Sequence, residues 1–458
     1  MAALALGLAA ATAGCAQGTG DDDTADFSGD EQLTGELSVM GFGLGDEIAQ
    51  VRHDLAVEAL DGPDVSLSEG ELDVQAFLSA VASGNPPDLV VATRDQIGTF
   101  ASRGAVVPID DCLEAEQVDT GVFDKEALSQ VTFDGAVYGL PEFDTVQIAM
   151  ANGDLLADAG LSMADVDGSD WDAMAAASQA LTRSEGGKLS VIGVDSKLPE
   201  FLPLWARANG ADLLSADGRT AQLDDPRVLE ALEFALGIYD EQGGFATVKT
   251  YRDSADFFGA GNQFATGVLG AMPMETWYVN VLNESSPDAP LAFGPVKDRQ
   301  GEPLAYATGS AWAIPSGAEN PQAACRYAAT MTATDSWVAA AQERADARAE
   351  SGQVFTGILT ANTEADQRIR TELVDPQDAP APWDAAIDAS YTASEHTFTL
   401  PANPADAAFE TAWQDAVNRV LNGQQEPRAA LEQAQQEAQQ ALDEAWAAWD
   451  EGEGASQR

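Results

Sequence analysis

Polar residues directly follow a predicted buried strand in the first quarter of this chain. The apolar run Leu89-Val90-Val91 is typical of such a strand, and Thr93-Arg94-Asp95-Gln96 come shortly after it. Open α/β sheets bind their ligands at the carboxyl ends of their strands. The hydroxyl, carboxylate and amide groups at this edge can exchange hydrogen bonds with a polar solute. The pattern therefore predicts a binding site.

The same sequence contains few of the motifs that are typical of enzymes. It contains no Gly-x-Ser-x-Gly nucleophile elbow and no P-loop, and only His53 and His396 could serve a catalytic triad. No Cys-x-x-Cys occurs, which excludes a structural zinc site. We expect no metal and no cofactor. A secreted glycoside hydrolase would need two carboxylates flanking a bond, but among 76 acidic residues any such pair is uninformative.

Length and charge narrow the class of protein. The chain has 458 residues, which exceeds one ordinary core and predicts two domains. Its 76 acidic and 22 basic residues give a formal net charge of -54. Such a surface repels phosphate backbones, so we expect no nucleic-acid partner. The acidity is typical of a protein that must stay soluble in salt.

Helices flank the predicted strand on both sides. Phe77, Leu78 and Val81 lie on one helical face, and Gly84 ends this helix because glycine adopts the left-handed cap without strain. A second helix ends at Gly104. This alternation of helices and strands predicts a mostly parallel sheet covered on both faces.

The first residues have the pattern of an export signal. Residues 1–13 are almost wholly apolar but too few to span a bilayer, and Thr12-Ala13-Gly14-Cys15 resembles a bacterial lipobox. We expect a lipoprotein signal peptide over residues 1–15, lipidation at Cys15, and a flexible acidic tether over residues 16–34. Such an anchor would hold the protein at the extracellular face of the cell membrane. An ordinary apolar leader with a chance cysteine is the alternative.

Several motifs together resemble one family. Residues 77–113 (FLSAVASGNPPDLVVATRDQIGTFASRGAVVPIDDCL) are followed by YGLP at 138–141, AMPMETW at 271–277 and TGSAWAIP at 308–315. Their order and spacing resemble those of the solute-binding proteins of bacterial carbohydrate ABC importers, a broad family that includes the maltodextrin-binding proteins. The resemblance covers roughly residues 36–450.

The resemblance implies an α/β architecture, the type II periplasmic binding protein fold, with two lobes, a hinge and a ligand cleft between them. It implies that residues 35–144 and 306–355 form lobe 1 and that residues 145–305 and 356–450 form lobe 2. We expect the C-terminal helix that begins at Pro427 to dock on lobe 2 and residues 451–458 to be a disordered tail.

Sugar sites combine polar groups for the hydroxyl rim with aromatic plates for the apolar faces. The resemblance places both kinds of group in the cleft, with Trp277 as the main plate; buried core or solvated loop positions are the alternatives. Glu200 departs from an aromatic residue of maltodextrin binders. The implied ligand-binding residues are Thr93, Asp95, Gln96, Asp144, Thr145, Glu200, Trp277, Tyr278, Gly309 and Trp312.

The resemblance also makes a prediction about two of the three cysteines. Because the family fold places the segments around Cys112 and Cys325 in the same lobe, the resemblance implies a disulfide between them in an oxidising compartment. Two separate buried thiols are the alternative.

The function that the resemblance implies is capture of a sugar or oligosaccharide and its delivery to the permease subunits of an ABC importer. We expect a monomer that closes on its ligand and catalyses no reaction. A binding protein for a glycerophosphodiester, polyamine or peptide, and less so a glycoside hydrolase, remain alternatives.

Overall fold

The computed structural model describes residue 27, residues 33–374 and residues 379–456. The predicted signal peptide, the lipidation site Cys15 and most of the predicted tether lie outside these residues. Within the tether Phe27 is described, and its side chain is buried in the core of the first lobe. None of the described helices is long and apolar enough to span a bilayer.

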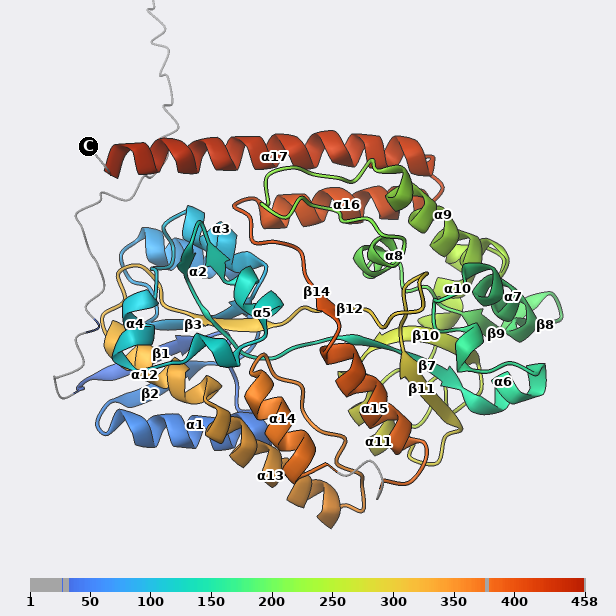
Figure 1. The fold of residues 1–458 in the computed structure, drawn as a ribbon, viewed down its shortest axis with the longest axis horizontal. Coiled ribbons are helices and arrows are strands. Elements are labelled where there is room, and N and C mark those ends of the chain that lie inside the picture. Colours follow the sequence, from blue (N-terminus) through green and yellow to red (C-terminus); the bar gives the residue numbers. More distant parts are fainter. Residues whose placement is uncertain (1–26, 28–32, 375–378, 457–458) are drawn as a thin grey trace, which may run out of the picture.

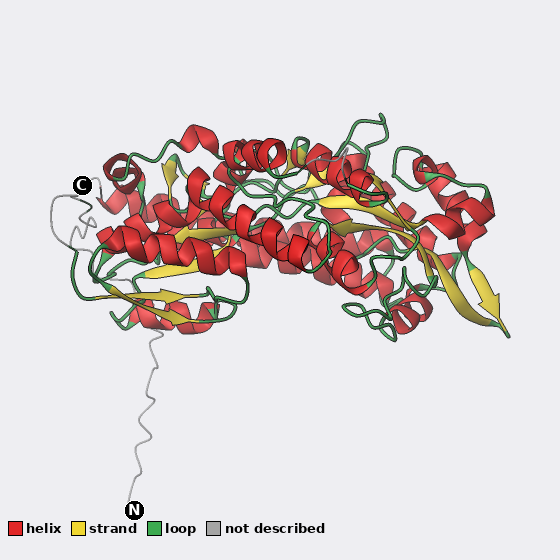
Figure 2. Ribbon diagram, turned by 90° about the horizontal axis from the view of Figure 1, so that it is seen from below, coloured by secondary structure: helices red, strands yellow, loops and turns green. Residues whose placement is uncertain are grey.

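Two separate sheets divide the molecule into two lobes (Figure 1). Seen from below, their strands gather in two groups at opposite ends of the molecule (Figure 2). The lobe 1 sheet has the strand order β2 (Asp64–Ser68), β1 (Glu36–Met40), β3 (Leu89–Thr93), β13 (Ser310–Ala313) and β6 (Leu140–Pro141). β1 is parallel to β2 and β3, whereas β13 is antiparallel to β3 and β6. The predicted mostly parallel sheet is therefore only partly right, because β13 returns from the other lobe and adds in the opposite direction.

The lobe 2 sheet is mixed in the same way. Its strand order is β11 (Leu291–Pro295), β7 (Gln147–Asn152), β10 (Leu269–Glu275), β9 (Lys188–Val194) and β8 (Arg183–Glu185). β9 and β10 are parallel, so their carboxyl ends lie at one edge of the sheet. β7 is antiparallel to β10 and β11, and β8 is antiparallel to β9.

Both faces of the central strand of lobe 1 are buried. Leu89 and Val91 belong to one core cluster, whereas Val90 packs in a second cluster with Phe77 and Phe100. A strand covered on both faces is a continuous apolar run rather than an alternating one. The lobe 1 helices are α1 (Glu47–Leu60), α2 (Val74–Ala82), α3 (Gln96–Ser102), α4 (Asp110–Ala115), α5 (Lys125–Gln130), α12 (Pro321–Thr332) and α13 (Thr334–Glu350).

Two short strand pairs and further helices lie outside the two main sheets. Small pairs are formed by β4 (Thr132–Phe133) with β5 (Ala136–Val137) and by β12 (Ala305–Tyr306) with β14 (Thr397–Phe398). The lobe 2 helices are α6 (Gly153–Ala159), α7 (Trp171–Leu181), α8 (Leu202–Ala208), α9 (Pro226–Asp240), α10 (Phe245–Arg252), α11 (Trp277–Ser285) and α15 (Trp383–Ser394). Three more are α14 (Thr363–Glu372), α16 (Asp406–Leu421) and α17 (Pro427–Ser456).

Chain segments cross between the lobes side by side. Thr145 and Thr308 exchange two backbone hydrogen bonds of 2.8 and 3.1 Å. Phe143 pairs with Thr360 in a further bridge, which adds a third segment to the crossing. These pairings form the hinge region and position the residues on either side of it.

The predicted lobe boundary at residue 356 is wrong for the segment that contains α14. Ile369 packs with Trp337 of α13 in one apolar cluster, and Asn362 donates a hydrogen bond to the carbonyl of Thr332 at 3.2 Å. This segment therefore lies with lobe 1, because its apolar face is buried against α13.

The C-terminal helix α17 contacts both lobes, so the prediction that it docks on lobe 2 is incomplete. Its Gln435 and Gln439 accept hydrogen bonds from the backbone of Leu223 and Ala221 in lobe 2. Near its other end, Trp449 donates a 3.0 Å hydrogen bond to Asp134 of lobe 1. Figure 1 shows α17 extending over both lobes above α16.

The predicted disordered tail is also wrong over most of its length, because α17 continues to Ser456. Residues 457–458 lie outside the described residues.

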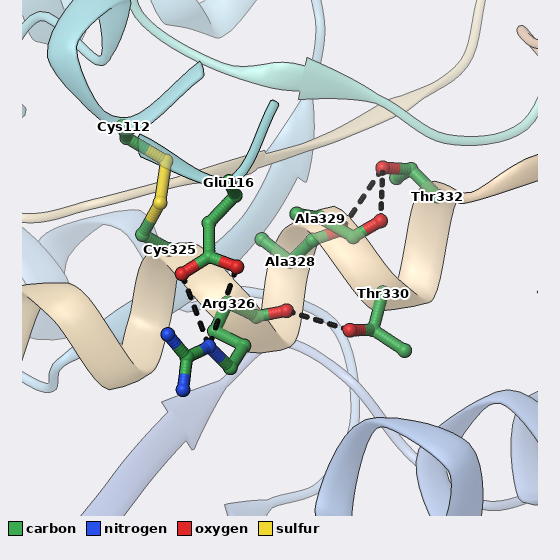
Figure 3. Close-up of a disulfide and its surroundings, with 8 residues drawn as sticks. All are labelled: Cys112, Glu116, Cys325, Arg326, Ala328, Ala329, Thr330 and Thr332. Carbon is green, nitrogen blue, oxygen red and sulfur yellow. Dashed lines mark hydrogen bonds and ion pairs between the residues drawn. A yellow bond between two sulfur atoms is a disulfide. The ribbon is translucent and has the colours of Figure 1, made fainter. Parts of the chain in front are cut away.

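A disulfide joins Cys112 of α4 to Cys325 of α12, as the resemblance implied (Figure 3). The two cysteines are 213 residues apart in sequence and both are buried. Beside them, Arg326 and Glu116 form an ion pair at 3.0 Å. The bridge ties the last segment of lobe 1 to its first.

Candidate ligand-binding site

A cavity of about 610 Å³ lies between the lobes next to the hinge. Its volume falls within the range usual for small-molecule sites. Lobe 1 lines it from the carboxyl end of β3 and the start of α1, and lobe 2 lines it from the end of β10 and the start of α11. The hinge strands form its floor with Thr145, Thr308 and Gly309.

The lobe 1 wall is held in place by a buried arginine. Arg94 is fully buried, donates to Gln130 at 3.0 Å and to the carbonyl of Phe143 at 3.1 Å, and forms an ion pair with Asp144. Burial raises the pKa of Asp144 above its usual value, although the attraction of Arg94 opposes this shift. Gln130, Phe143 and Asp144 all line the cavity, so Arg94 positions three wall residues from behind.

Gly309 is required by the close approach of the hinge strand to this arginine. A Cβ atom at position 309 would lie 1.9 Å from the carbonyl oxygen of Phe143 and 3.0 Å from the Arg94 guanidinium carbon. Any larger residue would therefore displace the wall.

The lobe 2 wall presents an exposed aromatic ring. Trp277 is the first residue of α11, has 38% of its surface exposed, and lines the cavity. Its indole nitrogen donates a 2.7 Å hydrogen bond to Glu275, which is the last residue of β10. This bond fixes the orientation of the ring, whose exposed part is available to a ligand.

The acidic groups at the site differ in whether a basic group neutralises their charge. Asp46 of the cavity wall is paired with Arg344 at 2.8 Å. Asp95 instead lies in a cluster with Asp406 and Glu410, in which one carboxylate oxygen from each residue lies within 4.8 Å of the other two. Burial, and then the charge of Asp95, raises the pKa values of Asp406 and Glu410. A raised pKa favours the uncharged, protonated form of a carboxyl, which limits the repulsion within the cluster.

Among the described residues, this cluster is the one group of three acidic, histidine or cysteine side chains whose spacing could hold a metal ion. Its all-oxygen donor set would suit a hard cation. Its two α16 members have raised pKa values, and a protonated carboxyl is a poor metal ligand. The raised pKa values therefore argue against a metal ion at this cluster.

The structure brings six of the ten predicted ligand-binding residues together around the cavity. These residues are Thr93, Asp95, Asp144, Thr145, Trp277 and Gly309. Whether they contact a ligand stays a prediction.

The other four predicted residues do not line the cavity. Tyr278 is buried beneath Trp277, where it stacks on Phe257 at 4.3 Å. Trp312 is buried in lobe 1 with its ring 5.0 Å from that of Phe42, so it is core rather than cleft wall. Glu200 is a largely exposed side chain 3.9 Å from Lys197. Gln96 begins α3 and is absent from the cavity lining.

Several cavity residues have no counterpart in the sequence prediction. Glu275 lies within the tryptophan motif at 271–277 and Tyr306 precedes the return crossing, so both could have been inferred from their neighbours. Arg344 and Ser390 come from helices α13 and α15, where no motif marks them. The remaining additions include Asp46, Gln130, Phe143, Asn280, Thr308 and Ser310.

Comparison with known proteins places this geometry in a family. The family described as bacterial extracellular solute-binding protein matches residues 58–349, which is more than half of the chain. The chain is also 25% identical over 270 residues to a maltooligosaccharide ABC transporter solute-binding lipoprotein of Streptococcus pneumoniae. That alignment covers 55% of this chain and 57% of the relative, so the chain spans about half the length of the curated relatives it matches.

Solved structures share the fold. A Listeria monocytogenes ABC substrate-binding protein in complex with cycloalternan superposes with a TM-score of 0.69 at 18% identity, covering 90% of this chain and 99% of that one. A mannobiose-bound protein named CpMnBP1 superposes with a TM-score of 0.68 at 22% identity, covering 89% of this chain and all of that one.

The fold is therefore that of the two-lobed periplasmic binding proteins. The chain belongs to the bacterial extracellular solute-binding protein family. The matched family and the curated relatives are binding proteins.

Proposed function

We propose that this protein captures a sugar or oligosaccharide outside the cell and delivers it to the permease subunits of an ABC importer. The observation that carries the proposal is the pairing of an exposed, oriented indole with hydrogen-bonding side chains across one interlobe cavity. Hydroxyl groups on the rim of a sugar match Thr93, Asp95 and Asn280, and its apolar face matches Trp277. The similarity to a maltooligosaccharide-binding lipoprotein and to structures in complex with mannobiose and cycloalternan supports this choice.

Ligand binding would be coupled to closure of the lobes. A ligand that contacts both walls stabilises the closed form, and only its preference for that form drives the motion. In this proposal the protein acts as a monomer, catalyses no reaction, and is held at the membrane through a lipid on Cys15. The lipoprotein name of the curated relatives supports the anchor.

A thermal-shift screen tests the proposal. Glucose, maltose, maltotriose, mannobiose and a control set of polyamines, glycerophosphodiesters and peptides are each added at saturating concentration. A ligand present at a hundred times its Kd stabilises the folded protein by about 2.7 kcal/mol, so one saccharide class should raise the melting temperature clearly. Stabilisation by a charged control and by no saccharide would contradict the proposal. Mass spectrometry of the recovered sugar should show it intact, and a hydrolysis product would contradict the binding-only role.

A further inference from the structure

Phe258 stands out among the apolar side chains of the molecule. The described residues include three large hydrophobic side chains classed as exposed, and Phe258, with 67% of its surface exposed, is the most exposed of them. The second is Trp277, and the rings of these two residues lie next to each other with centroids 6.1 Å apart. The third, Val57, lies on α1 in lobe 1. Two of the three therefore share one place, at the edge of the candidate site.

The exposure of Phe258 is fixed by the loop that carries it. Its neighbour Phe257 stacks on Tyr278, whose hydroxyl donates a 2.8 Å hydrogen bond to the Phe257 carbonyl. One residue further on, the carbonyl of Gly259 accepts a 3.0 Å hydrogen bond from Asn262. Phe257 thus anchors the turn in the core while Phe258 is held outward.

The orientation of Phe258 matches that of the cavity plate. Its ring lies within 19° of parallel to the indole of Trp277. Trp277 lines the cavity, whereas Phe258 is not part of the lining. The two neighbouring, nearly parallel rings therefore form one aromatic shelf, which combines a residue of the cavity lining with a residue outside it.

We propose that Phe258 is an outer sugar subsite, and that the ligand is an oligosaccharide whose chain leaves the cavity along the Trp277–Phe258 shelf. The proposal rests on the proposed function and names its substrate class more closely. An apolar ring held in solvent gains free energy when the face of a sugar covers it. A single sugar residue inside the cavity would leave Phe258 bare, so only a longer chain obtains this gain.

Isothermal titration calorimetry with ligands of increasing length tests the subsite. The probes are glucose, maltose, maltotriose and maltopentaose, with the corresponding mannose series in parallel. The wild-type protein should bind the longest sugars most tightly. Phe258→Ala should weaken the affinity for the longest sugar roughly tenfold and leave the affinity for the shortest sugar that binds unchanged, because only the outer contact is lost. Trp277→Ala should weaken every length.

Two further variants make the result specific. Phe258→Trp keeps an aromatic plate and should restore tight binding of the long sugars. Val57→Ala removes an exposed apolar group that is not part of the cavity lining and should change no affinity. Both exposed-site variants should melt at the wild-type temperature.

The outcomes separate the two proposals. Equal weakening at all lengths, or no change at any length, in Phe258→Ala would overturn the outer subsite while leaving sugar capture intact. Unchanged affinities with impaired uptake in cells would show that Phe258 contacts the permease, which also overturns the subsite. If no saccharide of either series binds the wild-type protein, sugar capture itself fails.

Discussion

The two walls of the cavity are built in different ways. The lobe 1 wall rests on Arg94, whose buried guanidinium holds Gln130 and Asp144 from behind. The lobe 2 wall presents the partly exposed rings of Trp277 and Phe258, which are positioned by a hydrogen bond to Glu275 and by the packing of Phe257 on Tyr278. Lobe 1 therefore fixes hydrogen-bonding groups in place before a ligand arrives. Lobe 2 instead supplies apolar surface, which contributes free energy to binding only when a ligand covers it.

The lobes also differ in how they are held together. All cysteines of the chain other than Cys15 are in lobe 1, where the bridge between Cys112 and Cys325 closes a segment of more than two hundred residues. Lobe 2 contains no cysteine, so no disulfide cross-links it. Changes behind the lobe 1 wall should therefore alter stability, and changes to the lobe 2 wall should alter affinity.

The largest effect is expected from Arg94→Met. The substitution leaves the buried carboxylate of Asp144 without its partner, and breaking a buried ion pair from one side costs about 3–5 kcal/mol. Denaturant unfolding should show this loss. The double variant Arg94→Met with Asp144→Asn removes the orphaned charge and should recover part of it. A single variant as stable as the wild type would contradict a supporting role for Arg94.

The next largest effect is expected from the disulfide. Replacing Cys112 and Cys325 together by Ala should lower the free energy of unfolding by about 2–5 kcal/mol, because the cross-link restricts a long loop of the unfolded chain. Hydrogen exchange should show that lobe 1 amides lose more protection than lobe 2 amides. Equal losses in both lobes would contradict the contrast drawn between them.

A smaller effect, confined to binding, is expected from Trp277→Ala. Loss of the plate should weaken saccharide binding by about 2 kcal/mol, or roughly thirtyfold, by calorimetry. The melting temperature without ligand should change little, because Trp277 lies at the edge of the core with 38% of its surface exposed. Wild-type affinity would remove Trp277 from the site, and a large fall in melting temperature would make it a core residue.

The smallest effect at any one pH is expected from two buried aspartates with opposite surroundings. Burial raises the pKa of Asp406, and the nearby Asp95 and Glu410 raise it further. Burial also acts to raise the pKa of Asp195, but Arg252, Lys197 and a hydrogen bond from Tyr239 outweigh it, so that pKa lies below its usual value. The pair is a matched test of how buried charge is compensated.

The sign of the effect differs between the two. Because the pKa of Asp406 is raised in the folded protein, the folded state binds more protons than the unfolded chain once the pH exceeds the usual Asp range, so the contribution of Asp406 to stability falls as the pH rises. Asp195 contributes stability above that range, and this contribution is lost as the pH falls through its lowered folded pKa. Each slope is at most about 1.4 kcal/mol per pH unit. The free energy of unfolding, measured against pH, should lose a contribution that falls with pH in Asp406→Asn and a contribution that rises with pH in Asp195→Asn. Changes of the same sign in the two variants would contradict this assignment.

Local patterns predicted the parts of the site that depend on local sequence. Thr93 and Asp95 follow directly from the end of a buried strand, and Trp277 and Gly309 lie in motifs with recognisable neighbours. Tyr278 follows Trp277 on a helix, where consecutive side chains point in different directions, so one faces the cavity and the next faces the core.

The errors come from contacts between distant segments. Trp312 lies within its strand, further inside lobe 1 than the cavity-lining Ser310, and no local signal distinguishes these depths. Arg344 and Ser390 reach the cavity because α13 and α15 pack there, which depends on the assembled lobes. The misplaced boundary at residue 356 has the same origin, because the apolar face of α14 could pack on either lobe until α13 was in place.

The central claim is that one saccharide contacts both walls at once. Differential hydrogen exchange with saturating oligosaccharide tests it most directly, because it reports amide protection in each lobe separately. We predict that the segments 93–98 and 275–281 become protected together, and that Trp277→Ala reduces the protection of both segments at the same oligosaccharide concentration. Protection confined to one lobe, or located away from the cavity, would contradict the account.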